Sequence, residues 1–551
     1  MMDRNTITAL LLIGVILILT PYYMELVSPT PSGLGDSLTF EPAKIVPSEE
    51  LSTTVSPAQS DTSFRHLTID SIEEQTATIE TDLYIAKISS RGGGLLTSFI
   101  LKKHIGPDSM YVDLINGKNR ENLSLQFKNL DAETINLSSP WHVNRSFHSE
   151  FITSPTTLKY YTIINDNKEI SKTLTFYPDS YLIDINIDLT SCKNVILSGT
   201  YFLAWRGGLP ITEKTPKDDQ MYFNGYVYQG GEIEETKAKS GEKILNVYNG
   251  NTDWTAVRTK YFISSFIPED PSSVVSASIA ATVDEREEYD MILTLPSNLP
   301  FYASLFLGPL EYDRIASVGK NLEEVMNFGW FFIRPISKGI LWLLKNIHIY
   351  IPNYGVVLII FSILVKIVVY PLTKKSYQST QAMQALQPEI ASMREKYKNN
   401  PEKLNQATMQ LYKKRGVNPL GGCLPMLLQM PLLFALFTVF RSTIELRGEP
   451  FIFWISDLSS PDIIFNLPFN IPIYGNYVCA LPMLMAGSMF IQQKMMSGGA
   501  VQQQQQKLMQ YFMMVFFFLI FNSFPSGLNL YYTLFNVLSI LQQKYLVSPS
   551  K

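Results

Sequence analysis

Apolar residues follow two different patterns in this chain, and the change between them divides it into two regions. From about 61 to 320 they recur at every second position, most clearly over 157–164, 170–176 and 181–189. Such alternation is typical of half-buried antiparallel strands. Turn signals, among them Arg91–Gly94, separate these segments at short intervals. The sequence therefore predicts a large antiparallel β-sandwich domain over 61–320.

Uninterrupted apolar stretches replace this alternation beyond 350. Each is long enough to cross a bilayer as a helix, and they lie at about 355–370, 421–440, 476–496, 507–523 and 528–546. A further stretch near the start of the chain, preceded by Arg4, predicts an uncleaved transmembrane anchor over 1–27 rather than a cleaved signal peptide. We expect six spans, five of which form a membrane α-helical core within 351–551.

Two segments connect these regions. Residues 28–60 are rich in Pro, Ser and Thr and hold few large apolar side chains, so they predict a flexible periplasmic linker. Residues 321–350 place apolar side chains on one side and Lys338 and Lys345 near the other. This pattern predicts an amphipathic helix that lies along the bilayer surface.

The charges of the loops predict the orientation. Residues 374–416 hold many more Lys and Arg than Asp and Glu, which favours the cytoplasm for this segment. Its apolar positions recur at alternating intervals of three and four, and Asn400–Pro401 is a helix-start signal, so we expect a cytoplasmic helical hairpin. Both chain ends are then cytoplasmic, and the sandwich and the loop over 441–475 lie on the outer face, which in a bacterium is the periplasm.

The cations of this hairpin are candidate docking residues for nascent chain, ribosome or lipid headgroups, the alternative being an ordinary solvated surface. They are Lys374, Lys375, Arg394, Lys396, Lys413, Lys414 and Arg415.

Composition agrees with a chain that is part soluble and part membrane. The 551 residues are 46% hydrophobic, and the net charge of −4 carries no nucleic-acid signature. Cys192, Cys423 and Cys479 lie far apart, and the five histidines form no ligand motif, so we predict no metal and no cofactor. The sandwich shows no spacing that pairs an acid with a base, which favours a scaffold or docking surface over a sugar-processing site.

Lys366 is the residue that most needs a functional explanation. It lies in the middle of the apolar stretch 355–370, where a lysine costs about 2.5 to 3.5 kcal/mol on insertion scales and usually faces a bundle interior or a wet cavity. Other spans also carry polar residues, which together could line one hydrated groove. The candidate groove set is Lys366, Ser362, Gln429, Ser488, Asn529, Tyr532 and Asn536.

Two other function classes stay open at this point. Ser362 and Lys366 lie one helical turn apart and could form a Ser-Lys hydrolytic dyad, although no oxyanion-hole motif accompanies them. A conducting transporter is the second alternative, and the absence of an inverted repeat and of a matched pair of broken helices disfavours it.

Several short segments resemble those of a known family. They are Tyr370–Thr373, Leu386–Pro388, Met393–Glu395, Asn418–Cys423, Gln429–Pro431, Phe524–Gly527 and Leu530–Tyr532. In this order and membrane context the chain resembles the YidC-type membrane protein insertases in their Gram-negative form, which are related to the mitochondrial and chloroplast insertases.

The resemblance implies a membrane protein insertase and folding chaperone of the bacterial inner membrane, and no enzyme. Such a protein takes nascent membrane proteins into a positively charged groove open to cytoplasm and lipid, alone or with the Sec translocase. The implied partners are nascent inner-membrane proteins, Sec translocase components, the ribosome and membrane lipids.

Two features depart from the family pattern. The groove cation of the family is usually Arg, whereas this chain has Lys366. A lysine keeps the charge but deprotonates more readily in a dry site, so we expect a well-hydrated groove. The stretch 542–551 is only weakly basic, so ribosome contact would fall mainly to the hairpin.

Overall fold

The computed structural model describes residues 72–115, 121–145, 149–164, 168–239, 241–283, 287–397, 400–417, 424–471, 474–497 and 504–547. The predicted anchor over 1–27 and the linker over 28–60 lie outside these residues.

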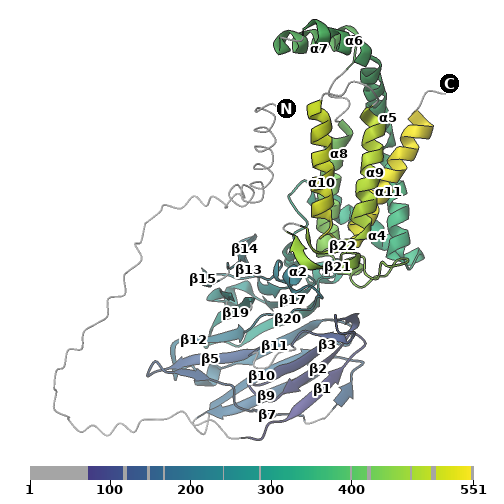
Figure 1. Ribbon diagram of the computed structural model, residues 1–551. Coiled ribbons are helices and arrows are strands. Elements are labelled where there is room, and N and C mark those ends of the chain that lie inside the picture. Colours follow the sequence, from purple (N-terminus) through teal and green to yellow (C-terminus); the bar gives the residue numbers. More distant parts are fainter. Residues whose placement is uncertain are drawn as a thin grey trace. The chain divides into compact units, whose positions relative to one another are not determined.

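Three sheets form the β-rich region, called here the sandwich domain (Figure 1). The strand orders are β14-β13-β16-β17-β20-β11-β10-β9-β7, β15-β18-β19-β12-β5-β6 and β4-β3-β2-β1-β8. The strands are β1 (Thr76–Glu80), β2 (Tyr84–Ser89), β3 (Leu95–Ile105), β4 (Tyr111–Asp113), β5 (Ser124–Asn129), β6 (Thr134–Asn136), β7 (His142–Val143), β8 (Ser149–Phe151), β9 (Thr156–Ile164), β10 (Lys168–Phe176), β11 (Leu182–Asp188), β12 (Ile196–Trp205), β13 (Asn224–Gln229), β14 (Glu232–Thr236), β15 (Lys243–Asn249), β16 (Trp254–Arg258), β17 (Phe262–Pro268), β18 (Ser276–Val283), β19 (Glu287–Pro296) and β20 (Phe301–Pro309). The short helices α2 (Pro216–Gln220) and α3 (Tyr312–Val318) accompany them.

The alternation in the sequence is visible in the strands. β9, β10 and β11 bury every second residue, because successive side chains of a strand point to opposite faces. The antiparallel register places Leu174 opposite both Leu158 and Ile185. The prediction of half-buried antiparallel strands is confirmed for these three segments.

The two smaller sheets contact the nine-stranded sheet at glycines. A Cβ atom on Gly225 of β13 would lie 2.3 Å from a side-chain carbon of Ile279 in β18. A Cβ atom on Gly94, before β3, would lie 2.7 Å from Leu174 and 2.8 Å from Tyr160 of the nine-stranded sheet. Close backbone approach of this kind excludes a larger residue, and the core of the domain lies between the sheets.

Lys172 is one of several ionisable residues buried in the sandwich domain. Lys172 of β10 is fully buried, and its ammonium group donates to the carbonyl of Leu123 at 2.7 Å. The same group lies 5.9 Å from the centre of the Trp141 ring. Burial lowers the pKa of Lys172 from its ordinary 10.5 to about 7, because a charge is poorly solvated in an apolar core.

The helical region follows the sandwich domain (Figure 1). Its helices are α4 (Arg334–Tyr350), α5 (Tyr354–Ala385), α6 (Gln387–Lys396), α7 (Pro401–Lys414), α8 (Leu424–Ser442), α9 (Ala480–Ser497), α10 (Gln504–Phe521) and α11 (Ser526–Gln542). Among the described residues, Tyr354–Pro371 is the segment long and apolar enough to cross a membrane, and Met430–Ser442 is a shorter apolar helix. The count of six spans stays a prediction.

The first candidate span and the segment predicted to be cytoplasmic are continuous. α5 runs for 32 residues through Pro371 to Ala385, so the hairpin begins later than the expected 374. Its two arms are α6 and α7, which pack through Leu386, Ile390 and Leu411. Asn400 caps α7 by accepting a bond from the Lys403 amide at 3.0 Å, which confirms the predicted helix start.

Two further segments differ from the expected elements. The helix expected over 321–350 begins at Arg334, after a short 3-10 helix at Leu322–Met326. The stretch expected to span the membrane from 476 starts with a strand, β22 (Gly475–Cys479), which pairs with β21 (Ile463–Ile471). Part of the loop predicted over 441–475 is therefore a β-hairpin.

Arg447, in the loop after α8, joins the helical region to the sandwich domain. Its guanidinium group pairs with Glu213 at 2.7 Å and donates to the carbonyls of Thr212 and Ile105 at 3.0 and 2.9 Å. The side chains of Arg447 and Glu213 are only 7% and 11% exposed. Burial raises the pKa of Glu213, and the charge of Arg447 opposes this shift.

Candidate functional site

Lys366 lies inside the helical region, where α5 packs against α11. Its side chain is 9% exposed, and its ammonium group donates to the hydroxyl of Ser539 at 2.5 Å. The nitrogen also lies 3.5 Å from the centre of the Phe535 ring. A hydroxyl and an aromatic face stabilise a cation without neutralising it.

The geometry of α11 explains why these two residues meet one lysine. Phe535 and Ser539 are one helical turn apart and therefore lie on the same side of the helix. The Ser539 hydroxyl donates to the carbonyl of Phe535 at 2.7 Å, which leaves its oxygen free to accept from Lys366. Bond directions in this cluster are thus mutually consistent.

Ser362 does not pair with Lys366. Its hydroxyl is fully buried and donates to the carbonyl of Leu358 in its own helix at 2.7 Å. A base in a Ser-Lys dyad must lie within hydrogen-bond reach of the serine, whereas the lysine here takes Ser539 as its partner. The arrangement argues against the hydrolase hypothesis.

Ser488 and Asn536 form a second polar contact, between α9 and α11. The Asn536 amide donates to the Ser488 hydroxyl at 3.3 Å, and that hydroxyl donates to the carbonyl of Met485 at 2.8 Å. Asn536 lies one residue after Phe535, so it faces a different side of α11 from the lysine cluster.

Asn529 and Tyr532 lie nearer the start of α11, at the turn from α10. Asn529 is fully buried and donates to the carbonyls of Phe521 and Phe524 at 3.0 and 3.4 Å. The ring of Tyr532 packs edge-on against Phe521, and its buried hydroxyl has no hydrogen-bond partner in the described part of the chain. Asn529 therefore stabilises the turn, and Tyr532 brings an unsatisfied polar group into the bundle.

The predicted groove residues thus gather around α11 but in separate places. Gln429 belongs to α8, and its side chain lies outside the described part of the structure. Sequence reasoning missed Phe535 and Ser539, and it also missed a buried contact of Gln542 with Thr373 at 3.0 Å. A signal existed, because Phe535, Ser539 and Gln542 recur at helical spacing on one side of α11.

The candidate docking residues of the hairpin are largely accessible. Lys374, Lys375, Lys396, Lys413, Lys414 and Arg415 are exposed, and Arg394 is half-buried. Arg415 pairs with Glu389 of α6 at 2.6 Å, so part of its charge is compensated.

Two family models match this chain in succession. Residues 76–343 match the YidC periplasmic domain, and residues 346–551 match the 60Kd inner membrane protein. Together they define an insertase of the inner membrane with a periplasmic sandwich domain, followed by a helical region. This is a class of membrane protein insertases and not of enzymes.

Relatives that align over almost the whole chain are also described as membrane protein insertases. The membrane protein insertase YidC of Chlorobium phaeovibrioides is 37% identical over 100% of this chain and 96% of its own length. That of Prosthecochloris aestuarii is 36% identical over 99% and 94%. A crystal structure of an active YidC insertase with its first transmembrane domain resolved is 16% identical, with a TM-score of 0.37, over 87% of this chain and 94% of that chain. The chain belongs to the YidC family of membrane protein insertases.

Proposed function

We propose that this chain inserts nascent membrane proteins into the inner membrane and that Lys366 attracts acidic residues in the polar segments that must cross. The uncompensated charge of Lys366 is the observation that best supports this role. Within the described residues its contacts are a hydroxyl and an aromatic ring, and none of the ion pairs there includes it. A cation held in this way remains available to a carboxylate from outside.

The energetics favour insertion without a nucleotide. Transfer of a substrate helix into lipid releases about 25 cal/mol per Å² of apolar surface, while the polar tail resists crossing. A cation inside the apolar region lowers that resistance, because charge interactions strengthen where water is scarce. The role proposed for Lys366 is to lower the barrier for the tail, and the substrate helix supplies the driving force.

Binding of a substrate carboxylate requires an exchange of partners. Lys366 would leave the hydroxyl of Ser539 and the ring of Phe535 and turn its flexible stem towards the substrate. Ser362 and Asn529 are fully buried, and the predicted groove residues lie in separate places around α11. A hydrated groove that includes Ser362, Gln429, Ser488, Asn529, Tyr532 and Asn536 would therefore require the helices around α11 to separate.

The wider proposal keeps the topology predicted from the sequence. It has an anchor over 1–27, a linker over 28–60 and a core of five spans, with both chain ends in the cytoplasm. The hairpin cations contact the ribosome or lipid headgroups. Cooperation with the Sec translocase and a chaperone role in membrane-protein folding complete the proposal.

Reconstitution tests the role of Lys366. The purified chain is placed in protein-only liposomes with a small substrate that has an acidic outward tail, and insertion is measured by protease protection. The variants are Lys366→Arg, Lys366→Ala and Lys366→Glu. Lys193→Glu is the matched control, because it makes the same change of charge at an exposed position of the sandwich domain.

We expect insertion by the wild type, Lys366→Arg and the control, with loss in Lys366→Ala and greater loss in Lys366→Glu. Equal insertion by all variants would remove Lys366 from the mechanism but keep the insertase. No insertion by the wild type would point to an obligate partner.

A further inference from the structure

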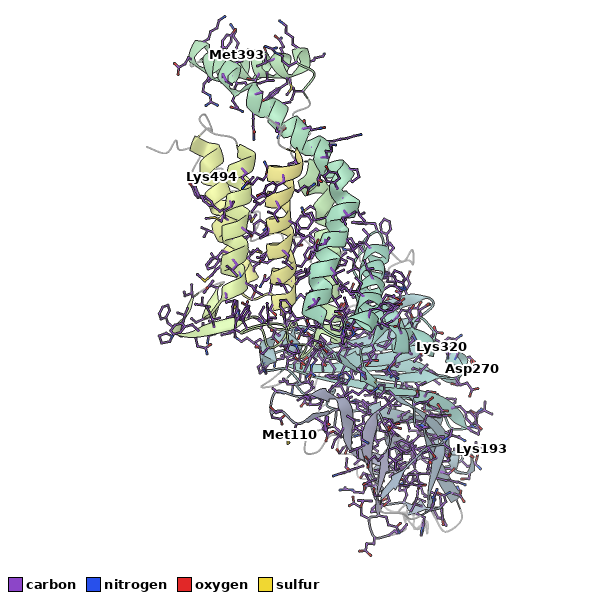
Figure 2. All side chains as sticks on the ribbon, turned by 90° about the vertical axis from the view of Figure 1, so that its right-hand side faces the viewer. Met110, Lys193, Asp270, Lys320, Met393 and Lys494 are labelled. Atoms are coloured by element: carbon purple, nitrogen blue, oxygen red, sulfur yellow. The ribbon has the colours of Figure 1, made fainter. Side chains whose placement is uncertain are left out.

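The β21–β22 hairpin exposes several large apolar side chains along β21. Ile463, Ile464, Phe465 and Phe469 of β21 are 44%, 52%, 58% and 60% exposed. β21 is exposed at consecutive positions, 463–466 and 468–470. Consecutive exposed positions leave neither face of the strand covered. In Figure 2 this hairpin projects sideways at the foot of the helices with its side chains uncovered. In water, one face of a hairpin is normally polar.

Buried polar residues hold the root of the hairpin in place. Asn522, at the end of α10, donates to the carbonyls of Tyr474 and Tyr477 at 2.9 and 2.8 Å and accepts from the Cys479 amide at 3.1 Å. Asp462 accepts from the Leu481 amide at 2.8 Å, at the first turn of α9. The hairpin is therefore fixed at the level where α10 ends and α9 begins.

An apolar turn, Phe453–Trp454, is attached to the root of the hairpin. Trp454 donates from its indole nitrogen to Asp462 at 3.0 Å, and Phe453 beside it is 89% exposed. The φ angle of Phe453 is 56°, in the left-handed region that bulky residues rarely adopt. Residues in this region are held there by the surrounding structure and often lie at functional sites.

We propose that the β21–β22 hairpin and the Phe453–Trp454 turn are embedded in the outer leaflet of the bilayer, at the boundary between headgroups and acyl chains. This proposal rests on the proposed topology, in which α8, α9 and α10 cross the membrane. The hairpin connects α8 to α9 and is held at the outer end of α10, so it lies at the bilayer surface whichever way it points.

The hydrogen-bonding needs of its backbone set the depth of the β21–β22 hairpin in the bilayer. A two-stranded hairpin has two open edges, and in pure hydrocarbon each unsatisfied N–H or C=O group would cost several kcal/mol. Headgroups and their water satisfy such groups at the boundary, while Phe, Trp and Ile side chains reach towards the acyl chains. The boundary between headgroups and acyl chains therefore suits both the open backbone groups and the apolar side chains of the hairpin.

Photocrosslinking in proteoliposomes tests this location. A benzoyl-phenylalanine replaces Phe453 or Phe465 in the full chain, and lipid adducts are detected by mass spectrometry after irradiation. Phe151 of β8, which is 53% exposed in the sandwich domain, is the matched control. Each probe variant is also tested for insertion, and protease accessibility of the sandwich domain reports orientation.

We expect lipid adducts at the Phe453 and Phe465 probes and none at the Phe151 probe. Adducts to a substrate or to another protein at the Phe453 and Phe465 probes, without lipid, would overturn the proposal, as would an absence of adducts at both. Crosslinking does not require activity, so a failure of the insertase mechanism would show as lost insertion with the lipid adducts retained.

Discussion

Removal of the buried charge at Lys172 should change the pH dependence of the sandwich domain. The pKa of this lysine falls from 10.5 to about 7 on folding, and each pKa unit corresponds to about 1.4 kcal/mol, so the charged form costs about 5 kcal/mol. The unfolded state binds more protons between these values, and stability therefore rises from pH 7 to pH 10.5. Below pH 7 Lys172 is charged in the folded state as well, so the folded domain bears the full cost of the buried charge.

Substitution of Lys172 by methionine removes this cost but also the bond to Leu123. A buried carbonyl left without a donor costs about 1 to 3 kcal/mol. The net gain at pH 6 is then about 2 to 4 kcal/mol, which corresponds to a rise in Tm of about 5 to 15 °C. Near pH 10 the gain should vanish or change sign, because the wild-type lysine is then neutral.

Calorimetry of the full chain in detergent at pH 6 and pH 10 measures this difference. Lys128→Met, at an exposed position of β5, is the matched control and should shift Tm little at either pH. An equal shift for Lys172→Met at both pH values would refute the reasoning, because a gain independent of pH cannot come from the charge.

Three further substitutions probe the helical region and its junction. Ser539→Ala should reduce insertion of an acidic-tail substrate less than Lys366→Ala does, because it removes one partner of the cation and not the charge; a larger loss in protease protection would contradict this. Arg447→Ala should destabilise the junction by about 3 to 5 kcal/mol, since Glu213 is left buried and unpaired, and limited proteolysis should then cut the chain between the sandwich domain and the helices. Asn522→Ala should leave three backbone groups at the hairpin root without partners, and hydrogen exchange over 474–479 should quicken while that over β9 does not.

Periodicity made much of the fold predictable. The alternation of apolar and polar residues was enough to predict β9, β10 and β11. The pair Asn400–Pro401 was enough to predict the start of α7. The length of α5 was not predictable in the same way. The first apolar stretch beyond 350 was expected to end at about 370, yet the helix continues through Pro371 to Ala385.

The candidate site was only partly predictable, because a face of a helix does not reveal its partner. Lys366 was identified because a lysine in the middle of an apolar membrane span costs free energy. Its partner Ser539 is 173 residues away in the sequence, and nothing in the sequence of its own helix distinguishes this serine. Asn529 has the residue type of a groove lining and instead binds the carbonyls of its own turn. The β21–β22 hairpin was missed because strands and helices of short apolar runs cannot be separated by periodicity alone.

Reversal of the charge at residue 366 and of the charge of the substrate tail tests the central claim most directly. Wild-type and Lys366→Glu proteins are each reconstituted with two substrates that differ only in the outward tail, one acidic and one basic, and all four insertion yields are compared. If the charge of Lys366 acts on the tail, the wild type should favour the acidic tail and Lys366→Glu should favour the basic one. The same order of preference in both proteins would contradict the account.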